Sequence, residues 1–353
     1  MELSSVSKRS WSRAKRLVQG GVVVLIFGFL LHRFYLSWTA AKGISFHFSV
    51  GWLAGATLFC WAVWWLSALA WRTILAQLGR QLGILESYRA FTLSQMGKYA
   101  PGKVWMLVGR VWLAGQSGVP KRITFVSLML ETVLILITGA LVGLTALSPV
   151  LRGGNGYLFL GLAIVVAVGA MFLHPRLFLP VVNLALRCLK KEPIPSALSW
   201  QGLLFVAALY FAVWFTMGAA FYAFVRALTP VPWSHLPLVT GVYALSWVSG
   251  FLAVFAPAGL GVREGMLAYL LVQFLPEPAA LAAALASRVW LMGCEVLFVL
   301  AAWGMGRGES GEMRVIQLCI RGKANEPSTQ GIQCEAIERR LTEAQETSEG
   351  TEE

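Results

Sequence analysis

Long apolar runs recur along this 353-residue chain, and their length limits how it can fold more than any other feature. A helix needs about 20 apolar residues to cross the hydrocarbon core of a bilayer. Runs of about that length cover residues 18–36, 49–72, 121–147, 157–175, 198–226 and 278–304. Only 13% of the residues are charged, which excludes an ordinary soluble enzyme. We therefore expect an all-α polytopic membrane protein with about six full transmembrane helices.

Two further apolar segments are interrupted by proline and glycine. Residues 83–116 are broken at Pro101-Gly102, and residues 236–275 are broken by Pro-Ala-Gly-Leu-Gly at 257–261. Irregular backbone is tolerated at membrane depth only where protein or a water-filled cavity surrounds it. We expect each segment to form a re-entrant hairpin of two short helices. The alternative is an ordinary bundle in which the breaks are kinks.

Short motifs recur at a nearly constant offset, which indicates an internal repeat. Residues 62–65 (Ala-Val-Trp-Trp) return 150 residues later as Ala-Val-Trp-Phe, and residues 99–102 (Tyr-Ala-Pro-Gly) return 156 residues later as Phe-Ala-Pro-Ala. We place the two units at about 17–147 and 157–305, each with two spans, a broken hairpin and a third span. Since three full spans change the side of the membrane, the second unit must be inverted. Paired, inverted units with broken helices are typical of secondary transporters.

The basic residues orient the spans. The net charge is +12, and with the N-terminus inside, 23 Lys and Arg fall on the cytoplasmic side and four on the outer side. This bias follows the positive-inside rule and predicts that both termini are cytoplasmic. It argues against a nucleic-acid partner, because long apolar runs would not separate the basic residues of a nucleic-acid binder. A cleaved signal peptide over residues 1–41 is the alternative for the first span.

Several enzyme classes are excluded by composition. The chain has no Asp, and its four His and five Cys are scattered singly, without a zinc or redox motif. We therefore expect no catalytic residue, no metal site, no cofactor and no enzyme activity. A polar, Glu-rich stretch at 307–353 is predicted to be a disordered cytoplasmic tail, after a transmembrane domain at 1–306.

Charged residues inside the apolar segments are the first candidates for a substrate site. An ionisable group at the bilayer centre costs roughly 2.5 kcal/mol or more, so such groups are paired, hydrated or functional. Glu131 lies well inside a span, and we expect it to pair with Arg288 at the corresponding repeat position. That pair is either a static packing contact or a gate. Glu295 lies seven residues after Arg288 on the same helix face, so both can line one cavity.

The second break contributes further candidates. Gly259 and Gly261, after Pro257, permit backbone that other residues resist, and the helix that follows would present free N–H groups to an anion. Arg263 adds a guanidinium suited to phosphate. Glu264 either belongs to the site or simply compensates the helix dipole.

The first break supplies a matching group of cations. Lys98 and Lys103 flank Pro101-Gly102, and Arg110 lies seven residues after Lys103 on the same helix face. These cations suit an anionic head group at a broken helix. The alternative is interfacial snorkelling and positive-inside charge.

These motifs resemble the lysylphosphatidylglycerol synthase transmembrane family, also described as flippase-like membrane proteins. The resemblance covers about 15–305 and rests on 97–105 (Gly-Lys-Tyr-Ala-Pro-Gly-Lys-Val-Trp) with Arg110, 118–120 (Gly-Val-Pro), Glu131, and 257–265 (Pro-Ala-Gly-Leu-Gly-Val-Arg-Glu-Gly). This family includes the membrane half of the bacterial multiple peptide resistance factor, whose flippase part moves aminoacylated phosphatidylglycerol between leaflets. The resemblance implies a lipid-handling protein of the bacterial cytoplasmic membrane. A polar tail follows the last span, so we expect no aminoacyltransferase domain and no synthase activity.

Residues and resemblance together predict a flippase or transporter that moves an anionic phospholipid or a lipid-linked phosphate between leaflets. Its partners would be membrane lipids with anionic head groups. The alternative is a non-transporting membrane subunit or regulator of a lipid-modifying enzyme or glycosyltransferase.

Overall fold

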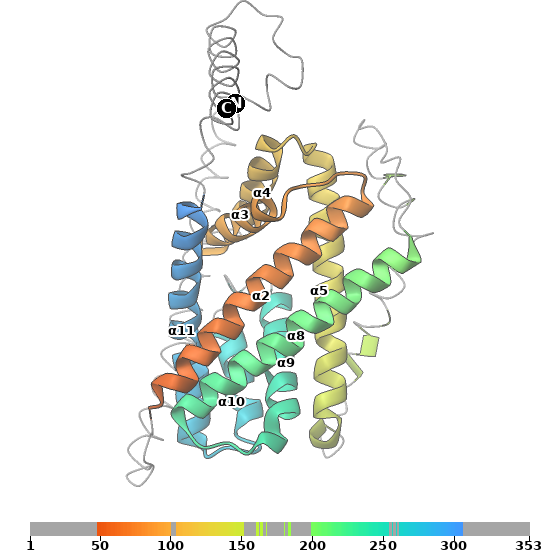
Figure 1. The fold of residues 1–353 in the computed structure, drawn as a ribbon. Coiled ribbons are helices and arrows are strands. Elements are labelled where there is room, and N and C mark those ends of the chain that lie inside the picture. Colours follow the sequence, from red (N-terminus) through yellow and green to blue (C-terminus); the bar gives the residue numbers. More distant parts are fainter. Residues whose placement is uncertain are drawn as a thin grey trace, which may run out of the picture. The chain divides into compact units, whose positions relative to one another are not determined.

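In a computed structural model of the chain, the residues described are 48–99, 104–151, 199–253 and 261–305, with isolated positions at 160–184, 256 and 259. All regular structure in these ranges is helical (Figure 1). The elements are α2 (Val50–Gln77), α3 (Ile84–Ser94), η1 (Gln95–Tyr99), α4 (Val104–Gln116), α5 (Lys121–Leu151), α8 (Trp200–Leu228), η2 (Trp233–His235), α9 (Leu236–Leu252), α10 (Val262–Leu271) and α11 (Glu277–Gly304). The chain divides into two compact units, residues 1–298 and 299–353, and the charged residues described below lie in the first.

Five helical stretches are long and apolar enough to cross a membrane, namely Val50–Gln77, Lys121–Ala146, Trp200–Leu228, Trp233–Leu252 and Glu277–Gly304. Four of them confirm the predicted spans at 49–72, 121–147, 198–226 and 278–304. The predicted span at 18–36, most of the one at 157–175, and the tail at 307–353 lie outside the described residues.

The fifth stretch differs from the prediction that both arms of each broken segment are short. With η2, α9 reaches crossing length, because residues 236–252 carry no charge and the single proline lies in the first turn, where a helix tolerates it. The other arms are short, at 11 residues for α3, 13 for α4 and 10 for α10.

Each broken segment folds back so that its two arms pack against each other, α3 on α4 and α9 on α10. Glycine permits a close approach at each break. A Cβ at Gly97 in η1 would collide with the backbone nitrogen of Met106, and one at Gly259 would meet the carbonyl oxygen of Gly250 at 2.7 Å. Gly259 and Gly261 also have φ of +69° and +84°, which other residues rarely adopt.

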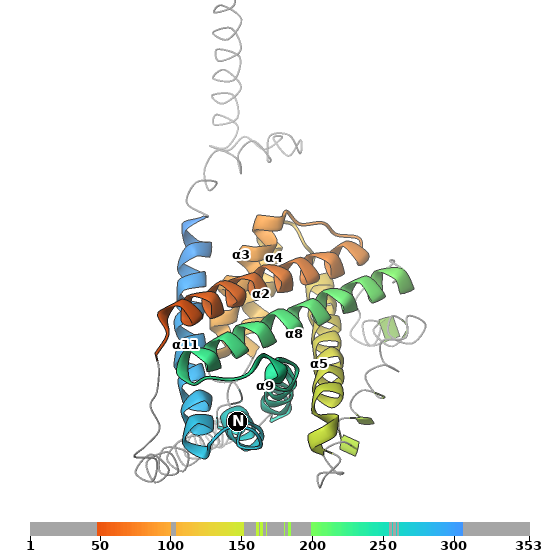
Figure 2. The same ribbon diagram turned by 60° about the horizontal axis from the view of Figure 1, so that its bottom comes forward.

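The helices α2 and α8 run antiparallel along their whole length. At one end the Ser49 N–H donates to the Ala227 carbonyl at 3.0 Å. At the other end the Ser199 hydroxyl donates to the Gln77 side-chain oxygen at 3.4 Å. Figures 1 and 2 show the two helices side by side in both views.

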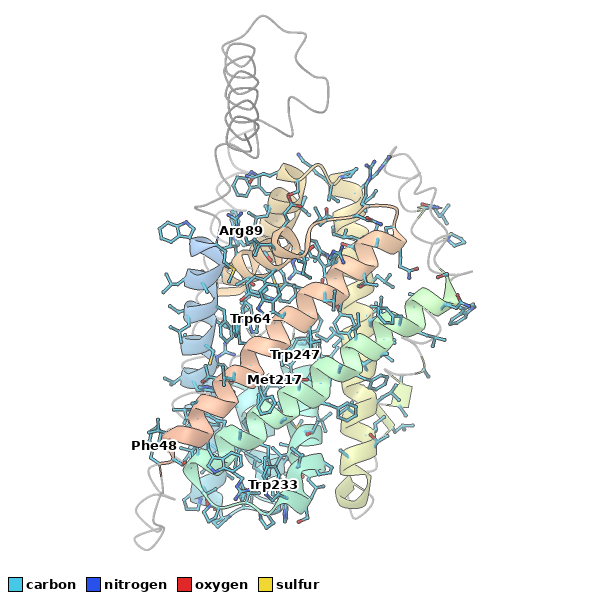
Figure 3. The ribbon with its side chains drawn as sticks, in the orientation of Figure 1. Phe48, Trp64, Arg89, Met217, Trp233 and Trp247 are labelled. Atoms are coloured by element: carbon cyan, nitrogen blue, oxygen red, sulfur yellow. The ribbon has the colours of Figure 1, made fainter. Side chains whose placement is uncertain are left out.

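Two tryptophans at the middle of this pair make corresponding contacts. Trp64 of α2 packs against Phe91 of α3 and Phe298 of α11. Trp214 of α8 packs edge-on against Trp247 of α9, and its indole N–H donates to the Thr138 hydroxyl of α5 at 3.1 Å. Both tryptophans are buried, and Figure 3 shows Trp64 and Trp247 among the helices. Each central helix therefore uses its tryptophan to contact a broken segment and a long helix.

Candidate functional site

The structure describes nine of the thirteen candidate site residues. These are Lys98, Arg110, Glu131, Gly259, Gly261, Arg263, Glu264, Arg288 and Glu295. The other four, Pro101, Gly102, Lys103 and Pro257, lie outside the described residues.

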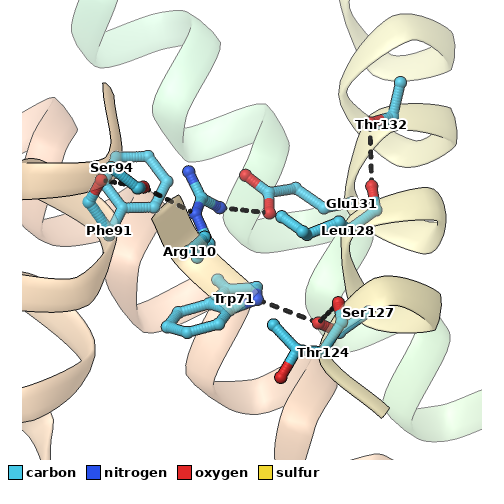
Figure 4. A network of polar contacts seen from close by, with 9 residues as sticks. All are labelled: Trp71, Phe91, Ser94, Arg110, Thr124, Ser127, Leu128, Glu131 and Thr132. Carbon is cyan, nitrogen blue, oxygen red and sulfur yellow. Dashed lines mark hydrogen bonds and ion pairs between the residues drawn. The ribbon is translucent and has the colours of Figure 1, made fainter. Parts of the chain in front are cut away.

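Arg110 and Glu131 form a buried ion pair between α4 and α5 (Figure 4). Only 1% of Arg110 is exposed, and its Nη1 donates to Glu131 Oε2 at 2.6 Å. Its Nε donates to the Ser94 hydroxyl of α3 at 3.0 Å. The guanidinium also lies 4.4 Å from the ring centroid of Phe91. A buried charge is retained only when it is paired and hydrogen-bonded, and this pair meets both conditions.

Trp71 extends this network toward α5. The Arg110 guanidinium lies 5.3 Å from the Trp71 ring centroid, and the indole N–H donates to the Ser127 hydroxyl at 3.0 Å. Ser127 in turn donates to the Thr124 carbonyl at 2.7 Å. The network joins α2, α3, α4 and α5, so movement of α4 would disturb all of them (Figure 4).

The expected pairing of Glu131 with Arg288 is wrong. Glu131 pairs with Arg110 because α4 and α5 are consecutive helices that pack together after the short Ser117–Pro120 connection. Arg288 faces α10 instead, where its Nε lies 3.8 Å from Glu264 Oε1. Repeat position alone therefore failed to identify the partner.

Glu264 has two roles at the start of α10. Its Oε2 accepts the Gly261 N–H at 2.7 Å, which caps the helix as the helix-dipole alternative implies. Its other oxygen faces Arg288. Glu264 is 2% exposed and Arg288 is 9% exposed. Within the described residues, the Nε and Nη2 atoms of Arg288 are buried without a hydrogen-bond partner.

Lys98 and Glu295 form a second ion pair, between η1 and α11. Arg263 lies near it, with its Nη2 donating to the Tyr243 hydroxyl of α9 at 2.6 Å. The charges of Arg288 and Arg263 act on Lys98. We call this set the central charge cluster, and its members are Lys98, Arg263, Glu264, Arg288 and Glu295.

The central charge cluster contains three cations and two carboxylates, so it carries an excess of one positive charge. Both Arg288 and Glu295 act on Lys98, whereas Arg110 is engaged by a different carboxylate, Glu131. Within the described part of the chain, no three His, Cys, Asp or Glu side chains gather as metal ligands would.

Sequence reasoning missed the neutral partners of these charges. Ser94 and Trp71 contact the buried Arg110, and Tyr243 contacts the half-buried Arg263. A hydroxyl or an indole inside an apolar run looks like a packing residue, because no charge marks it. The available signal was that three arginines within the apolar segments need more hydrogen-bond acceptors than the three intramembrane Glu residues supply.

A helical bundle with apolar, membrane-length helices and buried ion pairs is a multi-pass membrane protein. Residues 16–293 match the family model described as Lysylphosphatidylglycerol synthase TM region. The chain belongs to this family, and so to membrane proteins related to lipid modification. A comparison with curated proteins gave no match.

Proposed function

We propose that this protein moves an anionic phospholipid or a lipid-linked phosphate between leaflets, and that the central charge cluster receives the head-group phosphate. The observation that carries the proposal is the buried, incompletely partnered guanidinium of Arg288 in a cluster with an excess positive charge. An arginine fork binds phosphate through two parallel N–H donors, and Arg288 has Nε and Nη2 to offer. A bound phosphate would neutralise the excess charge.

Inverted repeats are the architecture we propose for the transport path. In such a repeat the equivalent helices run in opposite directions, as α2 and α8 do. Trp64 contacts α3 and α11, and Trp214 contacts the equivalent α9 and α5. This exchange of partners is what a pseudo-two-fold axis in the membrane plane would produce.

The two buried ion pairs fit the proposed inverted repeat, with the cation and the carboxylate exchanged between equivalent helices. Arg110 on α4 pairs with Glu131 on α5, and 154 residues later Glu264 on α10 faces Arg288 on α11. The first pair is short and is joined by a hydrogen bond, whereas the second is 3.8 Å apart and leaves two donors of Arg288 open. We therefore assign phosphate binding to the second pair and helix positioning to the first.

Transport would follow from competition inside the central charge cluster. An arriving phosphate competes with Glu295 for Lys98 and with Glu264 for Arg288. Release of either carboxylate loosens the contact of η1 or α10 with α11. The two re-entrant hairpins would then open alternately, so that the head group crosses in a hydrated path while its tails stay in lipid. In this proposal the chain is not an enzyme, and it lies in the bacterial cytoplasmic membrane with both termini inside.

Reconstitution tests the proposal directly. Purified protein in liposomes would receive fluorescent phosphatidylglycerol, and a membrane-impermeant quencher would report the fraction of probe in the outer leaflet. We expect faster exchange with wild type and its loss with Arg288→Gln. The exposed Arg80→Gln is the matched control and should exchange like wild type.

Two outcomes would count against the proposal. If folded wild type exchanges no anionic lipid, including a lipid-linked phosphate, the chain is not a transporter, and a role beside a lipid-modifying enzyme or glycosyltransferase is favoured. If Arg288→Gln exchanges lipid at the wild-type rate, the central charge cluster is not the phosphate site.

A further inference from the structure

Two buried cysteines lie where α2 crosses α11. The register of these helices is set by the Trp290 indole N–H, which donates to the Thr57 hydroxyl at 3.2 Å, and by Trp64 packing on Phe298. Cys60 lies between Thr57 and Trp64 on α2, and Cys294 lies between Trp290 and Phe298 on α11. Both helices therefore present a cysteine at the same level.

The two thiols interact with each other. The Cys294 sulfur also lies 4.0 Å from the hydroxyl oxygen of Thr57, which is three residues before Cys60 on α2. Both are free thiols, and Cys60 and Cys294 are 1% and 2% exposed. A single buried cysteine is a small packing residue, but two facing thiols on different helices can also form a covalent bond.

This contact adjoins the central charge cluster. Cys294 immediately precedes Glu295, and the charges of Lys98 and Glu295 both act on Cys60.

We propose that Cys60 and Cys294 form a redox-sensitive site that a small hydroperoxide converts into a disulfide joining α2 to α11. One sulfur attacks a peroxide oxygen, the O–O bond breaks, and the thiol proton leaves with the released oxygen as water when hydrogen peroxide is the oxidant. The resulting sulfenic acid is displaced by the second sulfur, and a second water leaves as the S–S bond forms. Two thiols are oxidised by two electrons, and one peroxide is reduced.

The disulfide would fix the position of α11, which carries Arg288 and Glu295. Oxidation would then hold the central charge cluster in one arrangement and stop transport, and a thiol reductant would restore it. This last step rests on the proposed function, whereas formation of the disulfide does not.

Crosslinking tests the disulfide without a transport assay. Full-length protein with Cys188, Cys319 and Cys334 replaced by Ser, and with a protease site inserted after Lys191, would be treated with hydrogen peroxide, alkylated and cleaved. We expect the two fragments to stay joined without reductant and to separate with it. Cys60→Ser and Cys294→Ser in the same background should give separate fragments.

Mass spectrometry and a transport readout complete the test. The joined product should be lighter by two hydrogens than the summed mass of the two reduced, unalkylated fragments. Separate fragments, or sulfinic acid in place of the disulfide, would overturn the proposal. If the disulfide forms but oxidised wild type still exchanges lipid as fast as Cys60→Ser, the site exists and its control of transport is refuted. If neither protein transports in its reduced form, the proposed function fails while the disulfide stands.

Discussion

Removing one member of the buried pair of Arg110 and Glu131 should lower the stability of the protein far more than removing both. Replacing Glu131 with Leu leaves a guanidinium that is 1% exposed without its counter-charge. Breaking a buried pair in this way costs about 3–5 kcal/mol. Arg110 keeps its hydrogen bond to Ser94 and its contacts with two aromatic rings, so we expect the lower end, about 3 kcal/mol.

The double variant Arg110→Met, Glu131→Leu removes both charges together. Ser94 keeps a partner, because its hydroxyl donates to the Phe91 carbonyl at 2.8 Å, so no polar group that contacts Arg110 through a hydrogen bond is orphaned. An apolar replacement of similar volume for a buried pair is often nearly neutral. We therefore expect the free energy of unfolding of the double variant to lie within about 1 kcal/mol of the wild-type value. The double variant should also be more stable than Glu131→Leu alone.

The assay is equilibrium unfolding of purified protein in mixed micelles, followed by tryptophan fluorescence, for wild type, both single variants and the double variant. Arg80→Met, at an exposed position, serves as the control and should change the free energy of unfolding little. Free energies that add within about 0.5 kcal/mol would refute a coupled buried pair.

Other changes probe the packing and the charge balance. Gly97→Ala should lower the melting temperature clearly, because its Cβ would meet the Met106 backbone. Gly115→Ala is the control and should not lower it, because nothing lies close to that position. Equal melting temperatures for the two variants would contradict the close approach at Gly97. Glu264→Gln keeps an acceptor for the cap on α10 but removes a negative charge beside Arg288, so it should bind phosphatidylglycerol more tightly in native mass spectrometry. Weaker binding would argue that Arg288 does not face the head group. Glu264→Ala also loses the cap and should cost about 1 kcal/mol of stability in addition.

The membrane spans were predictable because each one is marked by its own local sequence. An apolar run of membrane length is sufficient to identify α2, α5, α8 and α11, whatever packs around them. The glycines of the second break were also recognisable, since Gly259 and Gly261 do have positive φ. The close approach at Gly97 was not predicted. The charged site candidates could also be recognised from the sequence, because a charge in an apolar run needs a partner.

The partners themselves could not be predicted. Glu131 pairs with Arg110 on the neighbouring helix rather than with Arg288 at the matching repeat position. The packing of α4 on α5 decides which guanidinium Glu131 reaches. Lys98 and Glu295 meet only because η1 and α11 come together in the folded protein. Such pairings depend on tertiary geometry, which the spacing of residues along the chain does not predict.

The ion pairs also differ in when they can form during synthesis. Arg110 and Glu131 are 21 residues apart, so both enter the membrane at nearly the same time. Lys98 is 197 residues from Glu295, and at about 5–20 residues per second it waits about 10–40 s for its carboxylate. Until α11 is made, the nascent first half therefore holds Lys98 without the carboxylate of Glu295.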